Sequence, residues 1–127
     1  MSTTPVTVDI QRVRAGLPIR ELDKLAADLA LPRKHLLEAL RLSERTVLWR
    51  ASRKERLSQD ESQRVIRARS VLDRATELFG SKSEAAGWMT SPAYGLGGVR
   101  PIDWLDTDIG YQNVEALLTA IEWGNYF

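Results

Sequence analysis

Few side chains in this 127-residue sequence have the chemistry that catalysis or metal binding requires. His35 is the only histidine, and beside Leu36 and Leu37 a surface or packing role is more usual than general-base work. Cysteine is absent, which leaves no disulfide and no thiolate ligand for a metal ion. We therefore expect a protein that is not an enzyme and that holds no metal ion.

Two clusters resemble parts of active sites, but both favour structural roles. Asp103, Asp106 and Asp108 stand just before an expected helix, where carboxylates usually act as caps and complement the helix dipole. The glycine-rich stretch 95–98 lacks the following Lys-Ser/Thr of a phosphate-binding loop and predicts a turn. Neither pattern indicates a cofactor or a small-molecule substrate.

The net charge of +1 conceals two segments of opposite sign. Residues 33–74 contain twelve Lys/Arg and six Asp/Glu, a net charge of +6, whereas residues 75–127 contain two bases and seven acids, a net charge of −5. This asymmetry indicates two surfaces with different partners, one of them a nucleic acid. The alternative is that the bases only solvate helix faces.

Residues 33–52 have the apolar spacing of a helix-turn-helix, with Leu36 and Leu40 in the first helix, Leu42 in the turn and Val47 in the second helix. In such motifs the second helix enters the major groove, with its first residues at base edges and later cations at phosphates. The candidate DNA-binding residues are Ser43, Arg45, Thr46, Arg50, Arg53 and Lys54.

Two positions depart from the usual motif. Leu37 stands at the helix crossing, where a small residue is usual, and Arg41 replaces the turn glycine. A residue other than glycine can adopt the required positive φ at some energetic cost. An ordinary helical hairpin without a DNA partner is the alternative.

Apolar periodicity and capping residues predict an all-α fold. Residues 1–15 are expected to be a flexible tail, residues 16–57 a helix-turn-helix region, and residues 58–127 a second helical region. Ser43 is expected to cap a helix with Val47 and Leu48 on its apolar side. Ser58 and Glu61 form a capping box that begins the longest helix, which ends at Gly80, and Thr107 caps the last one.

The second region is rich in aromatic residues. Trp88 and Trp104 fit a small core and a protein interface equally well. Tyr126 and Phe127 stand outside any expected helix, so we expect them to be buried against a partner.

These segments carry a family resemblance. From about residue 16 to residue 127 the chain resembles the Xre/MbcA/ParS-type antitoxins, which pair with RES-domain toxins. The stretches that carry it are Leu57-Ser-Gln-Asp-Glu-Ser-Gln-Arg64, Leu78-Phe-Gly80, Trp88-Met-Thr-Ser-Pro92, Leu96-Gly-Gly98, Pro101-Ile-Asp-Trp-Leu105, Thr107-Asp-Ile-Gly110 and Val114-Glu-Ala-Leu-Leu118. Their order over most of the chain is more specific than any one of them.

The resemblance implies a homodimer that represses its own operon and inhibits a toxin that consumes NAD or transfers ADP-ribose. It makes residues 58–127 the dimerisation and toxin-binding region. It implies that C-terminal residues enter the active site of the toxin, a role that falls here on Trp123, Gly124, Asn125, Tyr126 and Phe127. The chain itself would bind no NAD. Two rivals are a stand-alone helix-turn-helix transcriptional regulator and a helical adaptor without DNA contact.

The sequence favours a cytoplasmic protein. No apolar run approaches the roughly 20 residues that a membrane span needs. Residues 1–9 lack the basic and then apolar pattern of a secretory signal.

Overall fold

The computed structural model describes residues 6–124, with side chains described from residue 10 onward. Over this range the fold is all-α, as the sequence predicts, and the only extended pairing is an isolated bridge between Ala93 and Val99. The elements in chain order are α1 (Val6–Ala15), α2 (Ile19–Asp28), α3 (Arg33–Ala39), α4 (Glu44–Ser52), α5 (Gln59–Phe79), α6 (Lys82–Met89), the short 3₁₀ helices η1 (Tyr94–Leu96) and η2 (Pro101–Trp104), and α7 (Asp108–Glu122). Among these described helices, none is both long enough and apolar enough to span a bilayer.

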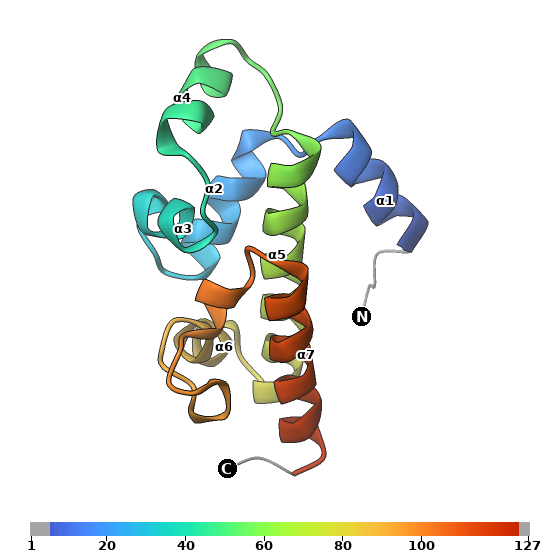
Figure 1. Ribbon diagram of the computed structural model, residues 1–127, viewed down its shortest axis with the longest axis vertical. Coiled ribbons are helices and arrows are strands. Elements are labelled where there is room, and N and C mark those ends of the chain that lie inside the picture. The colour runs from blue at the N-terminus through green and yellow to red at the C-terminus, as the bar shows by residue number, and fades with distance from the viewer. Residues whose placement is uncertain (1–5, 125–127) are drawn as a thin grey trace.

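Helix α5 is the central element, and α1, α2, α6 and α7 all pack against it (Figure 1). Its 21 residues extend over about 32 Å. The predicted capping box is present, since the Ser58 hydroxyl accepts from the Glu61 amide at 3.1 Å and the Glu61 carboxylate accepts from the Ser58 amide at 2.7 Å. Gly80 ends the helix with a φ of 90°, which confirms both predicted ends of the helix.

One hydrophobic core runs through both halves of the chain. It includes Leu22 and Leu36 near the N-terminus, Leu72 on α5, and Ile102 and Leu118 near the C-terminus. Ser62 is the one buried polar residue in the described part of the chain, and its hydroxyl accepts from the Leu17 amide at 2.8 Å. The two halves therefore share one packed interior, which favours a single cooperative folding unit.

Two arginines on α5 hold elements from different halves of the chain. The Arg64 guanidinium donates to the carbonyl oxygens of residues 40 and 41, at 3.2 and 2.7 Å. The Arg67 guanidinium donates to those of residues 105 and 106, at 2.9 and 3.0 Å, and burial lowers its pKa. These cations belong to the basic segment that the sequence analysis associates with a nucleic acid, and the structure uses them inside the fold.

The arginines farther along α5 make ion pairs. Arg69 contacts Asp28 at the end of α2, with Nη1 and Oδ2 2.8 Å apart. Arg74 contacts Glu115 on α7 and donates to the Thr119 hydroxyl at 2.7 Å. Helix α5 is thus tied to its neighbours by charge as well as by apolar packing.

The N-terminal segment differs from the sequence expectation. Residues 1–15 were expected to form a flexible tail, but residues 6–15 form α1. The apolar pattern of α1 is weak, and the helix is stabilised by tertiary packing against α5 and by an ion pair from Arg12 to Glu21 on α2 at 3.4 Å. Sequence periodicity carries no signal for such contacts.

The pair formed by Asp28 predicts a loss of stability in acid. Burial tends to raise the pKa of Asp28, but hydrogen bonds from Arg69 and Lys82 lower it below the ordinary value of 3.8. A carboxyl group whose pKa is lower in the folded than in the unfolded protein stabilises the fold at pH values above its unfolded-state pKa. This contribution is lost as the pH falls through its folded-state pKa. We expect Asp28→Asn to lower the melting temperature at pH 7 but to match the wild type near pH 2. An equal deficit at both pH values would assign the effect to packing.

Candidate functional site

The α3–α4 segment forms a helix-turn-helix even though the turn has no glycine. Arg41 occupies the turn with a φ of 57°, the positive angle that this position of the motif requires. Leu37 is buried at the crossing, and its carbonyl accepts from the Leu42 amide at 2.8 Å. Arg64 donates to the carbonyl oxygen of Arg41, so α5 holds this strained turn in place.

The structure brings the six candidate DNA-binding residues together on α4 and on the residues that directly precede and follow it. Helix α4 projects from one end of the molecule (Figure 1). Ser43 caps it as predicted, accepting from the Thr46 amide at 3.1 Å, and Val47 anchors it in the core. Arg45 and Lys54 are exposed and Thr46 is half-buried.

Arg50 differs from the other candidates because its side chain turns back toward α5. Its Nε lies 2.9 Å from a carboxylate oxygen of Glu61, the same residue that completes the capping box. Its side chain is only 23% exposed. A phosphate contact by Arg50 stays a prediction, and it would require this ion pair to open.

Leu48 does not lie on the apolar side of α4 as expected. It is 57% exposed, and the adjacent Trp49 is 53% exposed. The Arg53 guanidinium lies over the Trp49 indole, with its Cζ 4.9 Å from the ring centroid. The short helix contributes one fully buried anchor, Val47, and Leu48 follows it by about 100° around the helix axis.

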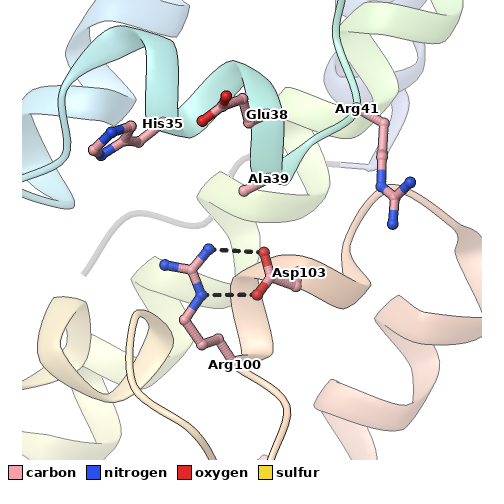
Figure 2. Close-up of a pocket in the computed structure, with 6 residues that line it drawn as sticks. All are labelled: His35, Glu38, Ala39, Arg41, Arg100 and Asp103. Atoms are coloured by element: carbon pink, nitrogen blue, oxygen red, sulfur yellow. Dashed lines mark hydrogen bonds and ion pairs between the residues drawn. The ribbon is translucent and has the colours of Figure 1, made fainter.

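A polar cleft of about 530 Å³ lies between α3 and η2 (Figure 2). His35, Glu38, Ala39 and Arg41 line one side and Arg100 and Asp103 the other. Arg100 donates to both carboxylate oxygens of Asp103, at 2.7 and 2.9 Å, and this raises the pKa of Arg100. His35 is exposed, in agreement with a surface role, but the expectation that Asp103 acts as a cap is wrong.

Neither of the other two aspartates of that cluster is the N-cap residue of α7. Thr107 caps α7, accepting from the Gly110 amide at 3.0 Å. Asp108 accepts from Gln112 within α7, and the Asp106 carbonyl accepts from Arg67. No group of three or more potential metal ligands occurs among the residues whose positions are described.

The C-terminal end of α7, where the two described candidates for toxin binding follow, lies at the end of the molecule opposite α4 (Figure 1). Trp123 is the C-cap residue of α7 and is 75% exposed, and Gly124 follows with a φ of 76°. Asn125, Tyr126 and Phe127 lie outside the described residues.

The other C-terminal tryptophans pack inward. Trp88 and Trp104 are half-buried against the core, and the Trp88 and Phe79 ring centroids are 5.6 Å apart. This packing favours the core interpretation for both of these tryptophans.

The N-terminal and C-terminal parts of the chain each match a known family domain. Residues 9–69 match the antitoxin Xre-like helix-turn-helix domain, and residues 74–124 match the antitoxin Xre/MbcA/ParS C-terminal toxin-binding domain. An antitoxin Xre of Photorhabdus laumondii is 38% identical over 110 residues, which cover 86% of this chain and 74% of that protein. The chain belongs to the Xre/MbcA/ParS antitoxin family.

Two further relatives agree with this assignment. An antitoxin Xre of Yersinia enterocolitica is 30% identical over 93% of this chain and 80% of its own length. A protein of Sphingobium named Prs ADP-ribosylating antitoxin is 28% identical over 90% of this chain and 77% of its own length. The chain is therefore a non-enzymatic type II antitoxin with a helix-turn-helix and a toxin-binding C-terminal domain.

The two domains of the antitoxin meet inside α5. The helix-turn-helix match ends at residue 69 and the toxin-binding match begins at residue 74, both within the Gln59–Phe79 helix. The division at residues 57 and 58 stays a prediction, and it places all of α5 in the second region.

Proposed function

We propose that this antitoxin inhibits a RES-domain toxin, one that consumes NAD or transfers ADP-ribose, by occluding the toxin's active site. The observation that carries the proposal is the exposed Trp123 at the end of α7, because α7 belongs to the matched toxin-binding domain. A solvent-exposed indole offers a large apolar area at small entropic cost, as interface anchors do. The name of the Sphingobium relative supports ADP-ribosylation as the chemistry of the toxin.

The backbone at Gly124 supports the entry of the following residues into a cleft. Its positive φ ends α7 and changes the direction of the chain after Trp123. Asn125, Tyr126 and Phe127 are the residues that we propose enter the toxin, and two of these three residues are aromatic. The toxin would be occluded sterically, and the antitoxin needs no catalytic group for that role.

Co-expression with the neighbouring toxin gene tests the proposal. We expect the two proteins to co-purify, and we expect purified toxin to stop consuming NAD when the antitoxin is added. A complex in which NAD consumption continues would show that the antitoxin binds outside the active site. This result would leave the family assignment intact.

We also propose that the antitoxin represses its own operon through α4. Arg45 is exposed in the first turn of α4, and the first residues of a recognition helix are those that reach base edges. We expect Arg45→Ala to weaken operator binding roughly 5- to 150-fold, the equivalent of about 1–3 kcal/mol for such a contact. Lys82→Ala removes the same charge far from α4 and should leave binding unchanged in an electrophoretic shift. Equal losses in the two variants would reduce the role of Arg45 to general charge.

The proposed repressor is a homodimer, since paired half-sites on DNA require a two-fold axis. Light scattering should then give a mass about twice 14.3 kDa. A stable 14.3 kDa species at high micromolar concentration would contradict the dimer.

A further inference from the structure

The outward face of α4 combines one cation with two large apolar side chains. Arg45, Leu48 and Trp49 are three and four residues apart, so they share one face of the helix. All three are exposed, whereas Val47 points into the core and Arg50 pairs with Glu61. The side chains available to a partner therefore include two large apolar ones that a count of basic residues would not select.

The positive charges around the outward face of α4 indicate which kind of partner it fits. Arg45 precedes the two apolar residues and Arg53 and Lys54 follow them, all of them exposed. A partner must thus present negative charge on both sides of a narrow apolar surface. The major groove of DNA does so, because its phosphate rows flank base edges on which the thymine methyl is the apolar group.

We propose that Leu48 and Trp49 contact thymine methyl groups and thereby set the operator sequence that the antitoxin selects. The inference rests on the proposed binding of operator DNA by α4 and identifies the bases that it contacts. Arg53 supports it by lying over the Trp49 indole at 4.9 Å, which limits the orientations of the ring. Leu48 and Trp49 are specificity determinants, and Arg53 is a positioning residue.

Deoxyuridine substitution tests the contact without changing the hydrogen bonds of the base pair. Thymines within the DNase I footprint of the wild-type antitoxin are replaced singly by deoxyuridine, which lacks only the methyl group. We expect about a fourfold loss of affinity at each contacted thymine, the value for one buried methyl-sized group. Leu48→Ala and Trp49→Ala should bind the thymine and deoxyuridine duplexes equally at the thymine that each residue contacts. Ile109→Ala, an exposed apolar residue on α7, should behave like the wild type.

The outcomes separate this inference from the function on which it rests. If the wild type binds its upstream DNA but deoxyuridine has no effect at any position, the thymine contact is overturned and operator binding stands. If the Leu48 and Trp49 variants keep the full sensitivity to deoxyuridine, other residues contact the methyl groups and the inference is again overturned. If no upstream DNA is bound at low salt, the proposed operator binding itself fails. Both variants change exposed side chains, and their circular dichroism should match the wild type.

Discussion

Deletion of residues 124–127 is expected to abolish protection against the toxin while the antitoxin stays folded. The deletion removes two aromatic residues, and Gly124, the one of the four whose position is described, is exposed. Hot-spot aromatics contribute about 2–4 kcal/mol, so affinity for the toxin should fall roughly 30- to 1,000-fold. Growth of cells that co-express toxin and truncated antitoxin measures the effect, and the melting temperature of the truncated protein should be unchanged.

Single substitutions give this deletion a matched control. Trp123→Ala should weaken inhibition in the same direction, since its side chain is 75% exposed at the end of α7. Tyr94→Ala removes an aromatic side chain that is 80% exposed on η1, elsewhere in the same domain, and should leave inhibition unchanged. Full protection by the deletion variant would show that the helices inhibit the toxin and that residues 124–127 do not.

Gly110→Ala is expected to destabilise the antitoxin more than any single surface change. Gly110 is buried in the first turn of α7, and a Cβ there would lie 1.9 Å from the carbonyl oxygen of Trp104. The obstacle is backbone held by the hydrogen bonds of Arg67 to the adjacent carbonyls, so it cannot rotate away. We expect a loss of about 3 kcal/mol, the upper part of the usual range for overpacking. A fall of roughly 10 °C in melting temperature should accompany it.

Gly87→Ala is the control for this effect because no atom lies within 4 Å of the added Cβ. Gly87 is an exposed glycine within α6, where alanine raises helix propensity. This change should stabilise the protein by about 0.5–1 kcal/mol. If both alanine variants melted at the wild-type temperature, the close approach of α7 to Trp104 would not exist in solution.

The elements that the sequence predicted correctly are those specified by local signals. Ser58 with Glu61, Gly80 and Thr107 mark helix ends through hydrogen bonds or backbone angles within a few residues of themselves. The positive φ of Arg41 followed from the turn alone in the same way. These contacts depend little on the rest of the molecule, so a sequence pattern is enough to find them.

Two of the expectations that failed, the flexible N-terminal tail and the buried Leu48, depend on neighbours distant in sequence. Helix α1 is stabilised by α5, and the exposure of Leu48 follows from how far α4 projects beyond the core. Composition also does not predict whether an arginine side chain is exposed to solvent or donates to a backbone carbonyl. Arg64 and Arg67 count as basic residues in the sequence but bind backbone carbonyls in the fold.

The antitoxin has no linker between its halves, because both family domains include part of α5. The rotation of one half relative to the other about the axis of α5 is therefore set by the number of residues in that helix. One residue inserted between positions 69 and 74 would turn the N-terminal half by about 100° relative to the C-terminal half. Arg67, which precedes the insertion, would then be turned away from the carbonyl oxygens of residues 105 and 106 in the C-terminal half, and the shared core would be divided. Exchange of halves between relatives, in evolution or in design, is thus restricted to junctions that keep the residue count of α5 unchanged.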